Sequence, residues 1–343
     1  MTTVMRVPLK KLTEGEMPSS DEIRDCFDAI MEGQVSQIQM AAFLTALKMR
    51  GERVADIAAA AGVMRAKATL IEAPDGTMDI VGTGGDGIGT YNISTATAFV
   101  VAGCGIPVAK HGNKAVSSKS GAADVLSCLG INLDCEMTLV RRALDEAGIC
   151  FLMAPRHHSA MRHVAPIRAD LGFRTIFNML GPLANPALVR RIMVGVFDPG
   201  LCAPFAEALA DLGTSHAWVV HGADGLDEVS TTGQTQVAAL VDGDIKEFTI
   251  SPDDLGLATA SINDLRGGTP EENAESLRAV LAGAQGPYRD IVIFNAAAAL
   301  VGGGHAATLR EGADRASESI GSGSATNALE NLVGITNSDS GDS

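Results

Sequence analysis

Aromatic residues and positive charges are scarce in this sequence, and each shortage excludes a class of protein. Aromatic side chains make up only 4% of the 343 residues, although 46% are hydrophobic. Such an aliphatic composition is typical of helices packed on a buried parallel sheet. With 26 basic and 41 acidic residues, the formal net charge is −15. This balance argues against sequence-independent binding to nucleic acid or to an anionic membrane.

Long apolar runs and paired cysteines are also absent. No run approaches the ~20 apolar residues that a membrane-spanning helix requires. The N-terminal sequence MTTVMRVPLKKLTEGE lacks the apolar segment of a signal peptide. The six cysteines are scattered without a C-x-x-C pair, which predicts buried thiols in a reducing compartment. We therefore expect a cytoplasmic protein.

The order of sequence patterns divides the chain into a helical part and an α/β part. Residues 1–72 contain only helical patterns, including a capping box in which Glu22 follows Ser19 by three positions. Over residues 73–335, strand and helix patterns alternate, which predicts a mainly parallel sheet flanked by helices. We therefore predict an α/β protein with a small all-helical N-terminal domain, a larger α/β domain whose mainly parallel sheet is flanked by helices, and a flexible tail over 336–343.

Three segments receive individual predictions within this alternation. The stretch 163–187 breaks the rhythm and is expected to join the helical domain. The sequence QVAALVDGDIKEFTI predicts a hairpin that turns at Asp242 and Gly243. The apolar sequence DIVIFNAAAAL, residues 290–300, is expected to form a strand that leads into a helix.

A glycine-rich loop in DIVGTGGDGIGTYNIST, residues 79–95, lies between a predicted strand and a predicted helix. Its clustered backbone N–H groups and the hydroxyls that follow suit an anion. Gly82, Gly84 and Gly87 also match the dinucleotide pattern G-x-G-x-x-G, but no acid follows at about 20 positions to hold a ribose. The Gly-Lys-Ser/Thr of a Walker loop is absent. The loop is predicted to bind phosphate, although it contains the carboxylate of Asp86.

A second loop, KHGNKAVSSKSGAAD at residues 110–124, also follows a predicted strand. It contains Lys110, Lys114 and Lys119, the densest cluster of positive charge in this acidic chain. Loops at the carboxyl ends of parallel strands form the usual ligand crevice. Two phosphate-binding loops on neighbouring strands predict a ligand with two separated phosphate groups.

Acidic residues mark a third loop, HGADGLDEVS at residues 221–230. Asp224, Asp227 and Glu228 follow a predicted strand that should open on the same crevice. Alone, these acids would be interpreted as solvated surface. Opposite two phosphate-binding loops, adjacent carboxylates are better explained as ligands of Mg²⁺, which prefers carboxylate and phosphate oxygens.

Arginine and histidine residues accumulate in the fourth segment, residues 156–187. His157, His158 and His163 have no cysteine or acid at a compact spacing, which argues against zinc. An arginine beside apolar surface suits an aromatic carboxylate, through ion pairing and ring packing. Arg168, in the sequence APIRADLG, meets this description.

The motifs GTGGD, NIST, KHGN-AVSSKSG-ADVL-LG, R-LG-RTIFN-LGPL-NP and DGLDE occur in this order. Together they resemble the anthranilate phosphoribosyltransferase family, of the nucleoside-phosphorylase-like class, over nearly the whole chain. The family usually has proline where this chain has Ser159, and often arginine where it has Lys114. The resemblance implies transfer of a phosphoribosyl group from phosphoribosyl pyrophosphate to anthranilate, with release of pyrophosphate, in tryptophan biosynthesis.

The resemblance also implies roles for individual residues, a Mg²⁺ ion, and a homodimer through the helical domain. Mg²⁺ ligands would be Ser94, Asp227 and Glu228, and anthranilate would contact Gly82, Asn113 and Arg168. No general base can be assigned. The residues implied for phosphoribosyl pyrophosphate are Gly82, Gly85, Asp86, Thr90, Asn92, Ile93, Ser94, Thr95, Lys110, His111, Gly112, Asn113, Lys114, Ala115, Val116, Ser117, Ser118 and Ala122.

Two other functions remain open at this point. A pyrimidine-nucleoside phosphorylase of related fold would use phosphate in place of pyrophosphate and gives no reason for the adjacent acids Asp227 and Glu228. A regulatory nucleotide-binding protein would keep the loops but bind its ligand without turnover.

Overall fold

A seven-stranded sheet with the strand order β3-β2-β1-β4-β5-β6-β7 forms the centre of the larger part of the chain. The computed structural model describes residues 3–115 and 120–339. Strands β1 to β5 are parallel, whereas β6 and β7 are antiparallel additions at one edge. The predicted mainly parallel sheet is therefore confirmed, and the carboxyl ends of β1 to β5 lie at the same end of the sheet. The strands are β1 Met78–Gly82, β2 Val108–Gly112, β3 Ile149–Met153, β4 Arg191–Gly195, β5 His216–Gly222, β6 Thr235–Val241 and β7 Asp244–Ile250.

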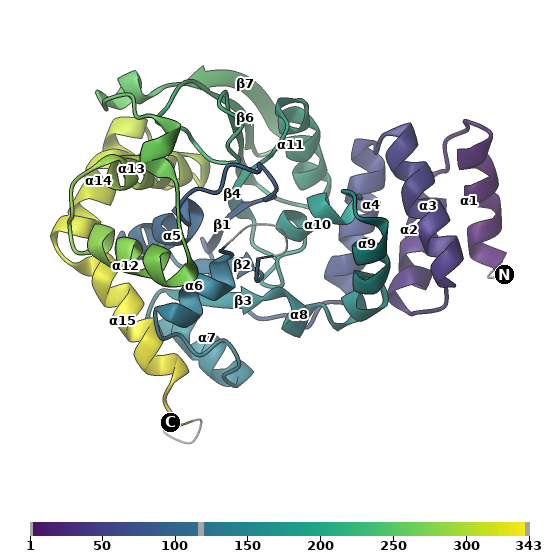
Figure 1. The fold of residues 1–343 in the computed structure, drawn as a ribbon, viewed down its shortest axis with the longest axis horizontal. Coiled ribbons are helices and arrows are strands. Elements are labelled where there is room, and N and C mark those ends of the chain that lie inside the picture. Colours follow the sequence, from purple (N-terminus) through teal and green to yellow (C-terminus); the bar gives the residue numbers. More distant parts are fainter. Residues whose placement is uncertain (1–2, 116–119, 340–343) are drawn as a thin grey trace.

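Helices cover both faces of this sheet (Figure 1). Successive residues of a strand point to opposite faces. On β5, Trp218 and Val220 join one core with residues of α5 and α13, whereas Ala217 and Val219 join a second core with residues of α10 and α11. The helices of this part are α5 Ile93–Gly103, α6 Ala122–Cys128, α7 Met137–Glu146, α8 Ala154–His157, α9 Ala165–Leu171, α10 Phe177–Leu183, α11 Cys202–Asp211, α12 Pro270–Leu281, α13 Pro287–Gly302, α14 Leu309–Gly321 and α15 Ser324–Thr336. Four short 3₁₀ turns are η1 Ser159–His163, η2 Pro199–Leu201, η3 Pro252–Leu255 and η4 Ile262–Leu265.

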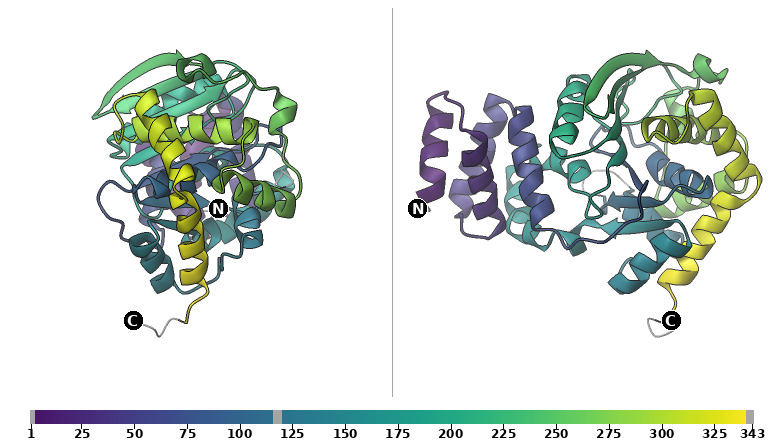
Figure 2. Two further views of the ribbon diagram at one scale, coloured as in Figure 1. Left: turned by 90° about the vertical axis from the view of Figure 1, so that its left-hand side faces the viewer. Right: turned by 180° about the vertical axis from the view of Figure 1, so that it is seen from behind.

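The N-terminal helices form a bundle that projects to one side of the sheet, with α1 farthest from it (Figures 1 and 2). The predicted capping box starts the second helix: Glu22 N–H donates to Ser19 Oγ at 3.2 Å, and Ser19 N–H donates to Glu22 Oε2 at 2.7 Å. The third helix ends before Gly51, whose φ of 87° favours glycine. The helices are α1 Thr3–Thr13, α2 Ser20–Met31, α3 Gln37–Arg50 and α4 Val54–Ala66.

Part of segment 163–187 packs against this bundle. Val164, Ile167 and Phe177 are buried in the same hydrophobic core as residues of α1 to α4. The Phe177 ring lies 5.5 Å from that of Phe27 on α2. The chain therefore returns to the helical bundle after β3. The domain boundaries at residues 72 and 336 stay predictions.

The structure tests the hairpin predicted at Asp242 and Gly243 and the strand predicted at the start of residues 290–300. The hairpin is confirmed, because β6 and β7 pair across Asp242 and Gly243, whose φ values of 48° and 97° fit the tight turn. The strand expected at the start of residues 290–300 is wrong, because these residues lie within α13. Ile291 to Leu300 are buried without interruption. A helix surrounded by core on all sides has no polar face, so its sequence resembles a buried strand.

Among the described residues, no helix has both the length and the hydropathy needed to cross a membrane. The six cysteines are unpaired; Cys128 is exposed, Cys104 is half-buried, and the other four are buried.

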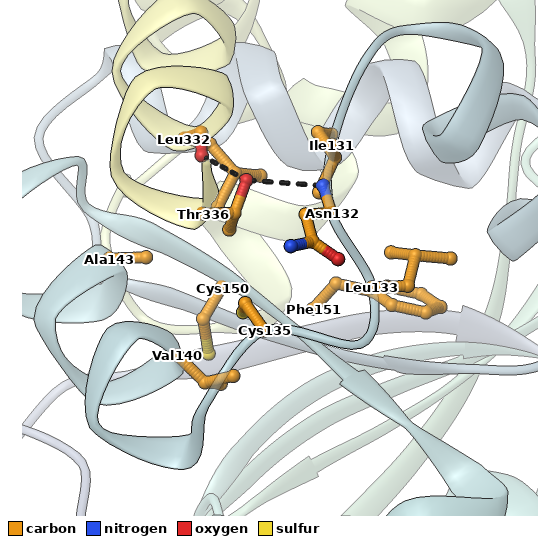
Figure 3. A pocket seen from close by; sticks show the side chains of 10 residues that line it. All are labelled: Ile131, Asn132, Leu133, Cys135, Val140, Ala143, Cys150, Phe151, Leu332 and Thr336. Atoms are coloured by element: carbon orange, nitrogen blue, oxygen red, sulfur yellow. Dashed lines mark hydrogen bonds between the residues drawn. The ribbon is translucent and has the colours of Figure 1, made fainter. Parts of the chain in front are cut away.

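A small cavity lies between β3, α7 and α15 (Figure 3). Its walls include Cys135 and Cys150, and Thr336 Oγ1 accepts a hydrogen bond from Asn132 N–H at 3.2 Å. The volume of about 10 Å³ is close to the minimum that admits one water molecule. This cavity is therefore a packing defect and cannot hold a substrate.

Candidate active site

The glycine-rich loop, the start of α5 and the acidic loop are joined by hydrogen bonds at the carboxyl end of the sheet. Gly84 N–H donates to Asp227 Oδ2 at 2.6 Å. Ser94 N–H donates to Glu228 Oε1 at 3.1 Å. The two adjacent acids thus contact the backbone of the predicted phosphate-binding segment 79–95 at two points, although more than 130 positions separate the partners in sequence.

Close packing of glycines makes room for Asp227. A Cβ atom on Gly82 would lie 2.4 Å from Asp227 Oδ2, and one on Gly195 would lie 1.6 Å from Asp227 O. Neither approach is possible for a larger residue without displacement of the acidic loop. The glycines that end β1 and β4 are therefore required for the position of this carboxylate as well as for the loop.

Both acidic side chains are almost fully buried, with 8% of each residue exposed. Burial raises the pKa of Asp227 to about 7, and the charge of Asp86 adds to this effect. Burial and the charge of Asp227 raise the pKa of Glu228 to about 8. Burial of two adjacent carboxylates disfavours their charged forms, so a site that contains such a pair is suited to a cation.

Lys110 is the nearest buried cation to these acids, and only 3% of it is exposed. Its Nζ donates to Ile80 O at 2.6 Å and to Ser94 Oγ at 3.3 Å. Burial lowers the pKa of Lys110, and the charges of Asp79, Glu228 and Asp227 oppose this shift. The sequence predicts that this lysine binds phosphate, and in the structure its ammonium group donates to Ile80 O and to the hydroxyl of Ser94.

Asp79, which the sequence analysis does not single out, lies at the centre of a buried network. Its Oδ1 accepts from the backbone N–H groups of Ile80 at 2.8 Å and His111 at 3.2 Å. Its Oδ2 accepts from Asn185 Nδ2 at 2.7 Å, and the same nitrogen donates to Ala109 O at 2.8 Å. The Asp79 carboxylate therefore connects β1, β2 and the turn at residues 183–186 through hydrogen bonds.

Asp86 lies in the glycine-rich loop, where its Oδ1 accepts from Ile88 N–H at 3.2 Å. Burial raises the pKa of Asp86. Arg174 reaches this loop from the segment between α9 and α10: its Nη2 donates to Gly85 O, and its guanidinium lies 4.2 Å from the Phe197 ring centroid. The cation that contacts the glycine-rich loop is thus one to which the sequence analysis gives no role.

The second loop continues from β2, and part of it lies outside the described residues. Asn113 and Lys114 are exposed. The N–H groups of Ala115 and Gly121 donate to Asp124 Oδ2 at 2.9 and 3.0 Å, which closes the loop onto α6. Ala122 begins this helix, and Gly112 packs on the Phe151 ring at the end of β2. Val116, Ser117 and Ser118, which the sequence analysis includes, lie outside the described residues.

Residues 90–95 form the entry to α5 beside the acidic loop. Thr90 and Asn92 are half-buried, whereas the side chains of Ile93 and Thr95 are each only 1% exposed. Ser94 presents both its N–H and its hydroxyl to the region of Glu228 and Lys110.

Arg168 lies on α9, half-buried, with its guanidinium 5.8 Å from the Phe177 ring centroid. Its Nη2 donates to Asn178 Oδ1 at 3.3 Å, and no acidic partner lies within ion-pair distance among the described residues. Burial lowers the pKa of this group. An arginine without an acid, held beside an aromatic ring, has the properties needed to bind an aromatic carboxylate.

The described residues include no group of three or more His, Cys, Asp or Glu side chains placed to hold a metal. The neighbouring oxygen donors are the carboxylates of Asp227 and Glu228 with the hydroxyl of Ser94. One or two carboxylates together with substrate phosphates are the usual ligands of Mg²⁺. The donor set therefore fits a Mg²⁺ ion that arrives with a phosphorylated substrate and does not fit a permanent zinc site.

Comparisons with known proteins agree with this arrangement. Residues 74–326 match the glycosyl transferase family a/b domain, and residues 8–68 match the helical bundle domain of the same family. Anthranilate phosphoribosyltransferase of Parvibaculum lavamentivorans is 54% identical over 335 residues, which cover 98% of each chain. The enzyme of that name from Azospirillum brasilense is 56% identical over 336 residues, covering 98% of this chain and 94% of the relative.

Solved structures give the same result. The anthranilate phosphoribosyltransferase of Thermus thermophilus superposes with a TM-score of 0.91 at 43% identity, covering 96% of this chain and 99% of that one. The Saccharomyces cerevisiae enzyme in complex with PRPP and Mg superposes with a TM-score of 0.90 at 32% identity and 98% coverage of both chains. The chain therefore belongs to the anthranilate phosphoribosyltransferase family.

Proposed function

We propose that this chain transfers the phosphoribosyl group of phosphoribosyl pyrophosphate to the amine of anthranilate, giving N-(5-phosphoribosyl)anthranilate and pyrophosphate in tryptophan biosynthesis. The single observation that supports this most strongly is the buried pair Asp227 and Glu228, which accept hydrogen bonds from two points of the predicted phosphate-binding segment 79–95, the N–H groups of Gly84 and Ser94. The residue roles set out above for the two substrates and Mg²⁺ are part of the proposal.

In the proposed reaction the amine nitrogen forms a bond to the anomeric carbon as the bond from that carbon to the pyrophosphate oxygen breaks. Pyrophosphate leaves with the bonding electron pair, and positive charge develops on the ribose, as in other oxocarbenium-like transition states. The amine then loses a proton, which water can accept. The protein's tasks are to stabilise the departing negative charge and to orient the amine.

Several groups of the chain can stabilise the negative charge of the departing pyrophosphate. Backbone N–H groups of the glycine-rich loop that do not already donate to Asp86, Asp227 or Gly195 can donate to phosphate oxygens. Ser94, Asp227 and Glu228 would hold Mg²⁺. When bound, this ion supplies positive charge that offsets the charge of the pyrophosphate. Lys110 Nζ donates to the Ser94 hydroxyl, and its positive charge favours the ionised form of Glu228.

For the second task, Arg168 would pair with the carboxylate of anthranilate, while Asn113 and Gly82 contact the same substrate. The guanidinium is preorganised by Asn178, whose Oδ1 accepts from both Arg168 Nη2 and Thr175 N–H. Arg168 would thus make one charge-assisted contact with the carboxylate of anthranilate, and the amine of anthranilate would stay free to attack the anomeric carbon.

Replacement of Arg168 with alanine is expected to raise the Michaelis constant for anthranilate about tenfold or more, because a hydrogen bond to a charged group contributes roughly 1.5–3 kcal/mol. The affinity for phosphoribosyl pyrophosphate should stay within about twofold of wild type. Arg162→Ala is the control, since this exposed arginine donates only to Ser159 O at 3.3 Å. Steady-state kinetics with each substrate varied will distinguish the two. A normal constant for anthranilate with collapsed affinity for the other substrate would reverse the assignment.

Replacement of Gly82 with alanine is expected to weaken binding of phosphoribosyl pyrophosphate about tenfold or more, because the added Cβ would displace Asp227 Oδ2, only 2.4 Å away. Overpacking of this kind typically costs about 1–3 kcal/mol. Gly334→Ala on α15 is the matched control, because nothing lies within 4 Å of its added Cβ. Calorimetric titration with Mg²⁺ present will measure both. Wild-type affinity in the Gly82 variant would show that the position of Asp227 does not matter for this substrate.

The proposed function is tested by the loss of anthranilate fluorescence when phosphoribosyl pyrophosphate and Mg²⁺ are added to the protein. We expect depletion of fluorescence only when all three components are present, with one pyrophosphate released for each anthranilate consumed. Phosphorolysis of thymidine by the same protein would instead support a nucleoside phosphorylase. Tight binding without turnover would support a regulatory nucleotide-binding protein.

A homodimer through the helical domain and a cytoplasmic location belong to the same proposal. Large apolar side chains are exposed on the bundle, where Ile38 and Met49 of α3 are 83% and 84% exposed. Burial of these residues against a second copy would remove apolar surface from water.

A further inference from the structure

We propose that Asn273 on α12 is a positioning residue that turns the side-chain amide of Asn92 so that its NH₂ group faces the phosphoribosyl substrate. The inference rests on the proposed function, because it concerns the same substrate. Asn273 lies about 180 positions from Asn92 in sequence, and no motif of the sequence analysis includes it. It is only 1% exposed.

The orientation of the Asn273 amide is fixed by a backbone group. Gly268 N–H donates to Asn273 Oδ1 at 2.8 Å. A backbone N–H can only donate, so the atom that faces it must be the oxygen of the amide. The nitrogen, Nδ2, must then lie on the other side of the amide, where it is 2.9 Å from Asn92 Oδ1.

The orientation of the Asn92 amide follows from that of Asn273. Because Asn273 presents a donor, the atom of Asn92 that faces it must be the oxygen. The hydroxyl of Ser120 donates to this oxygen as well, at 3.3 Å. Both acceptor positions of Asn92 Oδ1 are thus used on the protein side. Its Nδ2 points away from these donors, and within residues 3–115 and 120–339 no hydrogen bond is made by this NH₂ group.

Asn92 stands directly before α5, two positions from Ser94. An NH₂ group directed at this crevice can donate to a phosphate oxygen, whereas a reversed amide would present its carbonyl oxygen to the same negative charge. The direction of one amide therefore decides whether Asn92 attracts or repels the substrate. Asn273 sets this direction without touching the substrate itself.

The segment that leads into α12 holds the backbone beside Asn92 in place. Tyr91 N–H donates to Leu265 O, and Gly267 N–H donates to Gly89 O, both at 3.0 Å. A Cβ atom on Gly267 would lie 2.6 Å from Thr90 O and 2.9 Å from both amide atoms of Asn273. This close approach brings the Asn273 amide within reach of Asn92.

The Asn273→Asp variant tests the inference, because a carboxylate keeps the acceptor for Gly268 N–H and removes only the donor to Asn92. The Asn92 amide is expected to rotate and donate its NH₂ group inward, which turns its carbonyl oxygen toward the substrate. We expect the dissociation constant for phosphoribosyl pyrophosphate to rise about tenfold or more, with the Michaelis constant for anthranilate within about twofold of wild type.

A double-mutant cycle with Asn92→Ala separates orientation from charge and from general destabilisation. In the Asn92→Ala background, Asn273→Asp should weaken binding by less than about twofold further, because no amide remains to be turned. Asn263→Asp is the matched control: it makes the same chemical change in an exposed residue of the same segment, whose side-chain Oδ1 accepts from Arg266 Nε at 3.1 Å. It should bind the substrate as wild type does.

Wild-type affinity in Asn273→Asp, or an equal loss with and without Asn92, would overturn the inference while leaving the proposed function intact. A wild-type protein that fails to bind phosphoribosyl pyrophosphate would instead overturn the proposed function. If Asn273→Asp does not fold, the same cycle with Asn273→Ala decides, since this variant also removes the donor. Non-additivity with Asn92→Ala is again the expected result, and additivity refutes the inference.

Discussion

Simultaneous replacement of Asp227 with asparagine and Glu228 with glutamine is expected to lower kcat/KM by about a thousandfold or more, and to raise the Mg²⁺ concentration needed for activity. Removal of a single preorganised group that stabilises transition-state charge costs about a hundredfold or more, and this variant removes two. The substitutions preserve volume, and both amides keep an oxygen that can accept from Gly84 N–H and Ser94 N–H. The fold should therefore survive.

The pH dependence of thermal unfolding, measured without metal, provides a second test of this prediction. The folded-state pKa values of Asp227 and Glu228 are raised to about 7 and about 8, above the ordinary values near 4. The folded state therefore binds more protons than the unfolded chain between about pH 4 and 8, and its free energy of unfolding falls as the pH rises through this range. The amide variant should lose this part of the pH dependence and unfold at a higher temperature than wild type at pH 8.

Kinetics over a range of Mg²⁺ concentrations, with thermal unfolding followed from pH 5 to pH 8.5, will test both parts. The control is Asp253→Asn with Glu275→Gln, which neutralises two exposed acids outside the crevice. The control should match wild type in rate, Mg²⁺ dependence and pH dependence of stability. Wild-type Mg²⁺ dependence and rate in the Asp227 and Glu228 variant would refute their assignment as metal ligands.

Replacement of Lys110 with methionine is expected to destabilise the protein and to abolish most of its activity. The ammonium group is buried and interacts electrostatically with the buried carboxylates of Asp79, Glu228 and Asp227, so its loss removes a positive charge that offsets theirs. Removal of one partner from a buried charged group typically costs about 3–5 kcal/mol. The loss of the contact to Ser94 Oγ should also disorder one of the proposed Mg²⁺ ligands.

Urea unfolding, together with calorimetric titration of phosphoribosyl pyrophosphate, will distinguish this supporting role from direct phosphate binding. Lys246→Met is the control, because this lysine is exposed on β7. A large loss of stability in Lys110→Met with weaker Mg²⁺ binding supports the buried role. Full stability with loss of substrate affinity alone would mean that the ammonium group contacts phosphate directly, as the sequence analysis expects.

The elements of the fold that local sequence determines were predictable. The capping box at Ser19, the tight turn at Asp242 and Gly243, and the alternation that produces a parallel sheet all depend on neighbouring residues. The glycine-rich and acidic loops were recognisable because glycine clusters and adjacent acids are uncommon after strands. Their union at one end of the sheet follows from the parallel pairing of β1, β2 and β5 with their neighbours.

The contacts that position the site could not be read from the sequence. Asp79 meets Asn185 across 106 positions, and Asn273 meets Asn92 across 181. Such pairs depend on tertiary packing, and neither partner has a local pattern that reveals the other. The assignment of residues 290–300 was wrong for a related reason, because α13 is surrounded by core and lacks the polar face that identifies most helices. The richness of this segment in alanine, a strong helix former, was the signal that could have corrected it.

We propose that metal-bound pyrophosphate binds between the glycine-rich loop, the start of α5, and the acidic pair Asp227 and Glu228. A crystal structure of the protein with phosphoribosyl pyrophosphate and Mn²⁺ in place of Mg²⁺ tests this most directly, because anomalous scattering locates Mn²⁺ independently of the protein coordinates. We expect an anomalous peak within coordination distance of a carboxylate oxygen of Asp227 or Glu228 and of a pyrophosphate oxygen. A peak bound elsewhere, or a pyrophosphate bound away from both acids, would contradict it.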